Sequence, residues 1–199
     1  MKLLRCDRHL LRHAIFSIVA LCLIILILVA AGKIDANTPS PEAGFKVTTV
    51  FLVRHAEKAT TPPEDPPLTE AGNIRAQQLA RILEQAGIKA IYTSQFLRTK
   101  QTAEPLAKSL GITPALIPVK MSPSNPREVS EQSIRDITDK IFERAGEAAL
   151  VVGHSNTVPE VIKMLGADQS VTIDEKEFDN LFVVTVYARG KAKVARLKY

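Results

Sequence analysis

Short apolar runs alternate with stretches of helical periodicity along most of the chain. The first run, Val47–Val53, is rich in β-branched residues and predicts a buried strand. After Thr69, which suits the N-cap of a helix, apolar residues recur at helical spacing as far as Gly87. The alternation then continues toward Tyr199. It predicts strands at 90–92, 116–119 and 149–152, helices at 97–110, 129–145 and 158–165, and a closing pair of strands at 181–187 and 193–197.

This order of elements indicates the fold class. Strands that alternate with helices are typical of α/β proteins, in which helices cover both faces of a sheet. We therefore expect a three-layer α/β/α sandwich with a mainly parallel sheet over residues 47–199. A transmembrane or signal helix is expected to precede it.

The most apolar stretch of the chain lies before this domain. Ala14–Gly32 is a run of 19 residues without a charge. The apolar core of a signal peptide is about 7–15 residues long, whereas a membrane-spanning helix needs roughly 17–25. The length favours an uncleaved membrane anchor. A cleaved signal peptide stays open as the alternative, because Val29, Ala30 and Ala31 offer small residues for cleavage.

Charge is distributed unevenly between the two parts of the chain. The net charge is +5, of which residues 1–33 carry +4, so that the remaining 166 residues carry +1. The domain therefore lacks the basic excess of a nucleic-acid-binding face, and no nucleic-acid partner is expected. Basic flanks stay in the cytoplasm, which predicts a cytoplasmic segment 1–13, an anchor 14–32, a linker 33–46 and a domain outside the cytoplasm. Cleavage would instead give a secreted protein.

Two histidines and two arginines follow predicted strands. His55 comes directly after the first strand and His154 after the strand at 149–152. The carboxyl ends of strands face the ligand crevice of an α/β sheet, so these imidazoles could face each other. Arg54 and Arg98 add planar guanidinium groups that suit a phosphoryl group, and Ser94 adds a hydroxyl at a neighbouring strand end.

Three motifs carry a family resemblance: Arg54–Glu57, Arg98–Ala103 and Gly153–Ser155. Their order and spacing resemble the histidine phosphatase superfamily, which includes the phosphoglycerate mutases and the small phosphohistidine phosphatases. The resemblance spans roughly residues 47–199. It implies that His55 is the nucleophile and that Arg54, Arg98 and His154 hold the phosphoryl group.

The physical chemistry of these side chains agrees with that implication. A nucleophilic imidazole must be neutral, and nearby guanidiniums lower the pKa of a histidine. The arginines also neutralise the charge of the transferring group, so we expect no metal and no cofactor. The chain has two cysteines, Cys6 and Cys22, and both precede the domain, which excludes a cysteine nucleophile or cysteine-based zinc site there.

The general acid is not assigned by the motifs. Glu57 lies near the nucleophile in sequence, and Glu128 and Glu131 are alternatives, as are Glu177 and Asp179 before a late strand. A site without an acid would favour phosphoramidates or acyl phosphates, whose leaving groups depart readily.

We therefore predict a phosphatase that acts on a phosphomonoester or phosphoramidate through a phosphohistidine intermediate. Its substrate is a phosphorylated small molecule or phosphoprotein. The loops Thr60–Pro67 and Lys120–Arg127 are expected to set specificity. The alternatives are a phosphoglycerate-mutase-type phosphoryl transferase and a non-catalytic module that binds phosphorylated ligands. The sequence does not indicate an oligomeric state.

Overall fold

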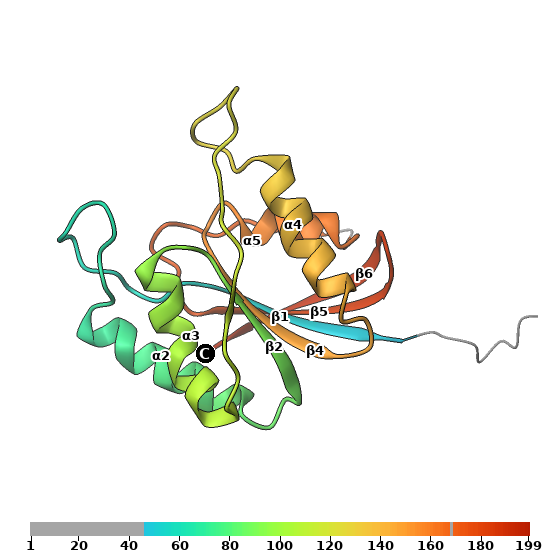
Figure 1. The fold of residues 1–199 in the computed structure, drawn as a ribbon, viewed down its shortest axis with the longest axis horizontal. Coiled ribbons are helices and arrows are strands. Elements are labelled where there is room, and N and C mark those ends of the chain that lie inside the picture. Colours follow the sequence, from blue (N-terminus) through green and yellow to red (C-terminus); the bar gives the residue numbers. More distant parts are fainter. Residues whose placement is uncertain (1–45, 168) are drawn as a thin grey trace, which may run out of the picture. The chain divides into compact units, whose positions relative to one another are not determined.

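The computed structural model describes residues 46–167 and 169–199, and within them the chain forms six strands and four helices (Figure 1). The predicted cytoplasmic segment, anchor and nearly all of the linker lie outside these residues. No helix of the described part is long and apolar enough to cross a membrane. The elements are β1 (Thr48–Arg54), α2 (Glu70–Leu83), β2 (Ile88–Thr93), α3 (Leu97–Leu110), β3 (Ala115–Leu116), α4 (Glu131–Phe142), β4 (Ala148–Gly153), α5 (Val158–Met164), β5 (Asn180–Ala188) and β6 (Lys191–Lys198).

The strands form one mixed sheet in the order β3-β2-β4-β1-β5-β6. The pairs among β1 to β4 are parallel, whereas β5 pairs with β1 and with β6 in the antiparallel sense. The predicted α/β class is confirmed, and the sheet is mixed, with three parallel and two antiparallel strand pairs. The reason is that β5 and β6 form a hairpin whose first strand joins the sheet beside β1.

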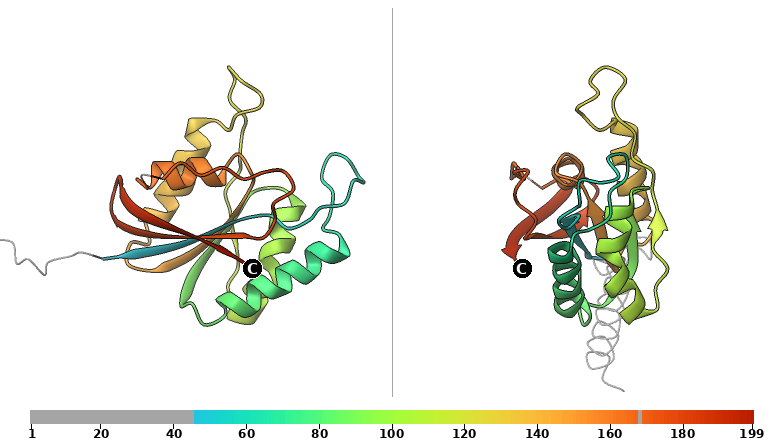
Figure 2. Two further views of the ribbon diagram at one scale, coloured as in Figure 1. Left: turned by 180° about the vertical axis from the view of Figure 1, so that it is seen from behind. Right: turned by 90° about the vertical axis from the view of Figure 1, so that its left-hand side faces the viewer.

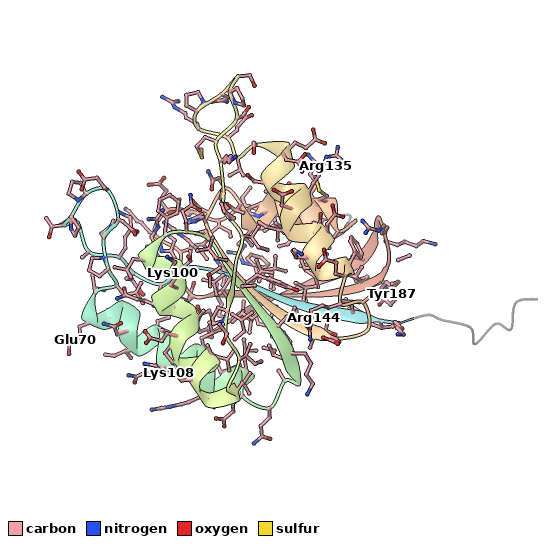
Figure 3. All side chains as sticks on the ribbon, viewed as in Figure 1. Glu70, Lys100, Lys108, Arg135, Arg144 and Tyr187 are labelled. Carbon is pink, nitrogen blue, oxygen red and sulfur yellow. The ribbon has the colours of Figure 1, made fainter. Side chains whose placement is uncertain are left out.

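Helices cover both faces of the sheet, as Figures 1 and 2 show. Side chains alternate along a strand, so that Val50 and Leu52 of β1 pack on one face and Val53 packs on the other. The first face carries α4 and α5, and the second carries α2 and α3. Charged side chains on the outer sides of the helices, such as Glu70 and Lys108, are exposed (Figure 3).

Two predicted elements differ most from the observed ones in their bounds. The strand at 116–119 is reduced to Ala115–Leu116, because Pro118 has no N–H to continue a ladder. The helix at 129–145 begins only at Glu131, where the Ser130 side chain accepts a hydrogen bond from Ser133 N and caps it.

The connection between β3 and α4 projects beyond the sheet as a loop (Figure 1). A bridge between Met121 and Val129 closes this loop, and Ser122 N donates to Glu128 O over 2.8 Å. The loop thus stands beside the carboxyl ends of the parallel strands, where the candidate site lies.

Candidate active site

The two histidines meet because their strands are neighbours. In the parallel pair β1–β4, Arg54 lies opposite Gly153, and the next amide, His55 N, donates to Gly153 O over 2.9 Å. The ring centroids of His55 and His154 are 5.4 Å apart at an interplanar angle of 64°. Both side chains are buried. The sheet therefore places the two imidazoles together, as the motif positions suggested.

A single hydrogen bond sets the tautomer of His55. Its Nδ1 lies 2.8 Å from Ala56 O, and a carbonyl can only accept, so Nδ1 carries the proton. The lone pair of the neutral ring is then on Nε2. Thr102 Oγ1 accepts a hydrogen bond of 2.9 Å from Ala56 N, which links the same backbone segment to α3. The motif residue Thr102 thus supports the segment that orients His55, a role that its sequence position did not reveal.

The environment of His55 keeps its ring uncharged. Burial is the largest cause, and together with the nearby Arg98 and Arg54 it lowers the pKa of His55 from 6.5 to about 4, although the hydrogen bond to Ala56 opposes the change. At neutral pH the ring therefore has a free electron pair, which a nucleophile requires.

His154 is oriented by a chain of hydrogen bonds. Arg98 Nη2 lies 3.5 Å from Nδ1, and because a guanidinium can only donate, Nδ1 is the acceptor and Nε2 carries the proton. Nε2 then donates to Ser94 Oγ over 2.9 Å, and Ser94 Oγ lies 3.0 Å from Thr99 Oγ1. Burial, followed by His55 and Arg98, lowers the pKa of His154 to about 3. The Ser94 hydroxyl is engaged with His154, whereas the sequence suggested that it contacts phosphate.

Both arginines are held in place by groups of the protein itself. Arg54 Nη1 donates to the carbonyls of Asp174 and Glu175 at 3.0 and 2.7 Å, and its guanidinium lies 4.2 Å from the ring centre of Phe178. Arg98 lies 4.2 Å from the ring centre of Phe96. Its Nη1 is 3.8 Å from a carboxylate oxygen of Asp65, a residue of the predicted specificity loop.

Each arginine has a buried donor that is left over. The Nε atoms of Arg54 and Arg98 are buried and have no hydrogen-bond partner among residues 46–167 and 169–199. Burial lowers the pKa of both groups, which reflects the cost of removing the guanidiniums from water. A buried N–H on a cation without a partner is costly, and an anion within hydrogen-bonding reach would satisfy it.

A pocket of 370 Å³ is lined by both histidines and Arg98, whereas Arg54 is not among its lining residues. Lys58 also lines it and lowers the pKa of His55 further, although the sequence gave no reason to treat it as more than a surface lysine. The remaining lining residues come from segments far apart in the chain: Phe96, Val119, Met121, Arg127, Val129, Ser155, Asn156 and Glu175. Arg127 and Met121 belong to the predicted specificity loop Lys120–Arg127.

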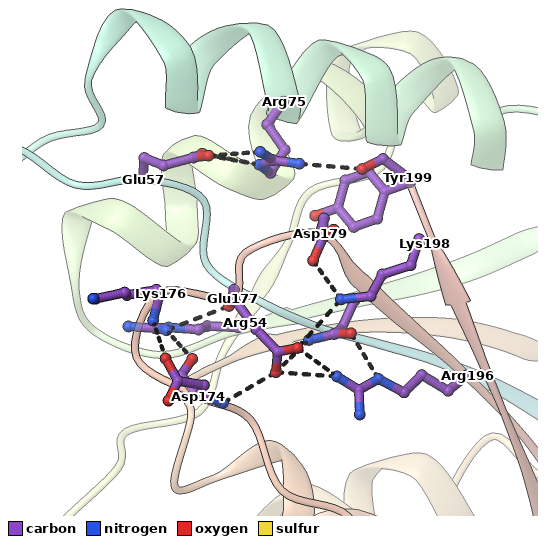
Figure 4. Close-up of polar contacts among 11 residues, drawn as sticks. Arg54, Glu57, Arg75, Asp174, Lys176, Glu177, Asp179, Arg196, Lys198 and Tyr199 are labelled. Carbon is purple, nitrogen blue, oxygen red and sulfur yellow. Dashed lines mark hydrogen bonds and ion pairs between the residues drawn. The ribbon is translucent and has the colours of Figure 1, made fainter.

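Glu57, the first candidate acid, is turned toward α2 (Figure 4). Its carboxylate accepts hydrogen bonds of 2.7 to 2.9 Å from Arg75, whose Nη1 also donates to Tyr199 O over 3.1 Å. Burial acts to raise the pKa of Glu57, but the bonds from Arg75 hold it below its usual value. A carboxylate held ionised in this way is a poor proton donor.

The other candidate acids also lie outside the pocket that contains His55. Glu128 and Glu131 line a neighbouring hollow, and Glu131 pairs with Arg135. Glu177 and Asp179 form ion pairs near the end of β6 (Figure 4). Among the residues that the structure describes, Glu175 is the carboxylate that lines the pocket. No motif or predicted strand end marks Glu175 in the sequence.

A known family matches the segment that contains His55 and Arg98. The family model of the histidine phosphatase superfamily (branch 1) matches residues 50–124, which contain His55 and Arg98. The resemblance to the histidine phosphatase superfamily is confirmed. The probable phosphoglycerate mutase GpmB of Cronobacter sakazakii is 40% identical over 75 residues, a match that spans 35% of this chain and 35% of GpmB. A PE-PGRS family protein of Mycobacterium tuberculosis is 46% identical over 54 residues, 27% of this chain and 9% of that protein.

Solved structures of the superfamily share the fold. The protein histidine phosphatase SixA, complexed with tungstate, superimposes with a TM-score of 0.58 at 20% identity, over 75% of this chain and 96% of SixA. A phosphoglycerate mutase from Bacillus anthracis gives a TM-score of 0.59 at 20% identity, over 76% of this chain and 93% of the mutase. The neighbours thus include both phosphatases and a mutase.

Proposed function

We propose that this protein is a phosphatase that hydrolyses a phosphomonoester or phosphoramidate through a phosphohistidine on Nε2 of His55. The observation that carries the proposal is the neutral His55 ring beside two buried guanidinium Nε–H groups that have no partner in the described part of the chain. The ring offers a nucleophile, and the two donors offer a place for the oxygens of a phosphoryl group.

In the first step, the lone pair on Nε2 of His55 attacks phosphorus, and the bond from phosphorus to the leaving group breaks. The ring becomes positively charged as the N–P bond forms. The Nδ1–H bond to Ala56 O then stabilises this charge, because a charge-assisted hydrogen bond is stronger than a neutral one. Arg54 and Arg98 meet the negative charge on the phosphoryl oxygens.

In the second step, water attacks phosphorus, the N–P bond breaks and inorganic phosphate leaves. The electron pair of the N–P bond returns to Nε2 of His55, and the protons of the water leave with the phosphate. The ring is then neutral again, and its Nδ1–H still donates to Ala56 O. A phosphate dianion would also favour the protonated form of His154, which could then donate from Nδ1 to an oxygen.

The leaving group that the site accepts depends on whether a carboxylate near His55 can act as general acid. The candidates Glu57, Glu128 and Glu131 lie outside the described lining of the pocket, and no buried carboxylate lines it, since Glu175 is exposed. We therefore propose a preference for phosphoramidates and acyl phosphates over alkyl phosphates.

Trapping the intermediate tests the mechanism. A substrate labelled in its phosphoryl group is mixed with the protein and quenched under alkaline denaturing conditions, because phosphohistidine is acid-labile. The native chain should retain label and release inorganic phosphate. His55→Ala should do neither, whereas His154→Asn should still accept label on His55 more slowly. Near-normal turnover by a folded His55→Ala protein would contradict the mechanism.

A phosphoglycerate-mutase-type transferase is the second candidate, and the identity to GpmB over 75 residues favours it. Release of inorganic phosphate and isomerisation of phosphoglycerates, measured on the same preparation, separate the two activities. Ligand binding without a trapped phosphoenzyme would indicate a non-catalytic binding module instead.

We further propose that residues 14–32 tether the domain outside the cytoplasm. The support is the 19-residue uncharged run with basic residues before it. Protease added to intact spheroplasts should then remove the domain, and full protection would contradict this placement. The N-terminal sequence of the mature protein distinguishes a retained anchor from a cleaved signal.

A further inference from the structure

A second hollow of 620 Å³ adjoins the pocket that holds His55. The two adjoin at Arg127, Val129, Ser155 and Asn156, which line both, and together they are called the depression. We call the second hollow the side groove. It is walled by α4, α5, the end of the loop 121–129 and residues 171–173. A substrate with its phosphoryl group at His55 can therefore extend its leaving group into the side groove.

The side groove has an apolar floor. Ile134 and Ile173 are buried there as parts of the hydrophobic core, and Val129, Met164 and Val171 pack against them while partly exposed. Ligand pockets commonly combine such a floor with a few polar groups that fix orientation. The floor favours a leaving group with apolar surface.

The lining of the side groove has more carboxylates than cations, although Glu131 also pairs with Arg135, which lies outside the lining. Three carboxylates line it, from Glu128, Glu131 and Glu160, against the cations Arg127 and Lys163. Lys163 is 4.0 Å from Glu160 and its side chain is 80% exposed, so it screens Glu160 weakly.

The pocket around His55 has the opposite balance of charge. Lys58, Arg98 and Arg127 line it against the single carboxylate of Glu175, with both histidines uncharged. The sign of charge thus changes from the phosphoryl end of the depression to the side groove. Such complementarity orients a ligand that is anionic at one end and cationic at the other.

We infer that the side groove binds the leaving group and selects leaving groups that combine apolar surface with positive charge. The inference rests on the proposed phosphatase function. Two sources share this chemistry, a polypeptide with a basic side chain near its phosphorylated residue and a small cationic compound.

Peptides of matched length test the inference on the full chain. The substrates are phosphohistidine peptides that carry lysine, glutamine or glutamate beside the phosphorylated residue, phosphohistidyl-lysine amide as a small cationic compound, and acetyl phosphate as a substrate too small to reach the side groove. At low ionic strength kcat/KM should be about tenfold higher for the lysine peptide than for the glutamate peptide. The ratio should shrink at high salt, because salt screens exposed charges.

Charge reversal supplies the matched variants. Glu160→Lys should lower the ratio for the lysine and glutamate peptides by about fivefold. Glu143→Lys should leave it unchanged, since Glu143 forms an ion pair at the same helical spacing, with Lys140, but lies outside both hollows.

The outcomes separate the inference from the proposed function. An equal kcat/KM for the lysine and glutamate peptides, or a ratio that Glu160→Lys does not change, would overturn the side groove assignment while turnover of acetyl phosphate still supports a phosphatase. No turnover of any substrate would overturn the proposed function itself. A higher kcat/KM for the lysine peptide than for phosphohistidyl-lysine amide identifies a polypeptide leaving group, and equal values identify a small cationic one.

Discussion

At the scale of single residues, the site depends on which atoms hold protons. Nδ1–H of His55 faces a carbonyl, and Nε2–H of His154 faces the hydroxyl of Ser94. The two rings therefore present different nitrogen atoms to the pocket, although both are neutral. Burial and the adjacent guanidiniums keep both rings neutral, so the same groups that would receive an anion also prepare the nucleophile.

Arg98→Lys is expected to impair the enzyme although it retains the charge. Lysine cannot reproduce the fork that reaches both His154 and an oxyanion, so kcat/KM should fall at least about tenfold and inhibition by inorganic phosphate should weaken. Steady-state kinetics with added phosphate measures both. Arg81→Lys, at an exposed position of α2, is the control. If turnover and phosphate inhibition stay unchanged in Arg98→Lys, then Arg98 does not bind the phosphoryl group.

The two histidines should also make stability depend on pH. Their pKa values are lowered from 6.5 to about 4 and about 3, so the unfolded chain binds more protons between these values. The neutral rings make their full contribution to the free energy of unfolding above about pH 6.5. This contribution is lost as the pH falls toward 4, by about 3 kcal/mol for His154. Denaturant unfolding across this pH range should show that the free energy of unfolding falls less steeply for His154→Gln than for the native chain. If the free energy of unfolding falls equally in both proteins, then His154 is not held in its neutral form by burial.

At the scale of secondary-structure elements, the segment after β1 is fixed by helices α2 and α3. Glu57 O accepts from Thr69 N over 2.9 Å, so the cap of α2 sits against the backbone just past the nucleophile. The side chain of Thr69 also caps the helix by accepting from Gly72 N. Helix packing therefore helps to hold the backbone that orients His55.

Gly72→Ala is expected to disturb this packing. A Cβ at Gly72 would lie 2.2 Å from Glu57 O, which is backbone and cannot move aside alone. We expect a loss of about 1–3 kcal/mol in the free energy of unfolding and a lower kcat, since the displaced strand end carries His55. Thermal unfolding and steady-state kinetics measure these effects. Asn73→Ala, at an exposed position of the same turn, should change neither, and a stable, fully active Gly72→Ala protein would show that α2 does not position the site.

At the scale of the whole molecule, the depression is lined by residues from segments far apart in the described chain. The loops after β1, β2, β3 and β4 meet at one edge of the sheet because these strands are parallel. The antiparallel β5 adds a further connection, residues 169–179, which supplies Glu175 and the carbonyls that hold Arg54. The mixed sheet is therefore part of how the site is built.

Activity is expected to persist after dialysis against a strong chelator. Arg54, Arg98 and the protonated form of His154 can neutralise a phosphoryl group, and the domain has no cysteine and no histidine besides His55 and His154. Phosphate release before and after dialysis measures the effect. A loss of activity that a divalent cation restores would contradict the expectation.

What the sequence determined by itself was local or periodic. The cap at Thr69 and the bounds 97–110 of α3 were predicted at the right residues, because the signals for a helix end lie within a few positions of it. The motif spacing also indicated that His55, His154 and Arg98 would converge. The apolar residues at helical spacing after Thr69 include Ile74 and Ile82, which are each 52% exposed, since helical spacing alone does not show which face meets the sheet.

Only the tertiary structure decided the contacts between distant segments. The pairing of Glu57 with Arg75, the bond from His154 to Ser94 and the presence of Lys58, Arg127 and Glu175 in one pocket depend on strand order and on loop paths. A sequence pattern with a period of two or of about 3.6 residues describes one element at a time. It contains no information on which strand lies beside β1, and that choice of neighbour determines which side chains meet around His55.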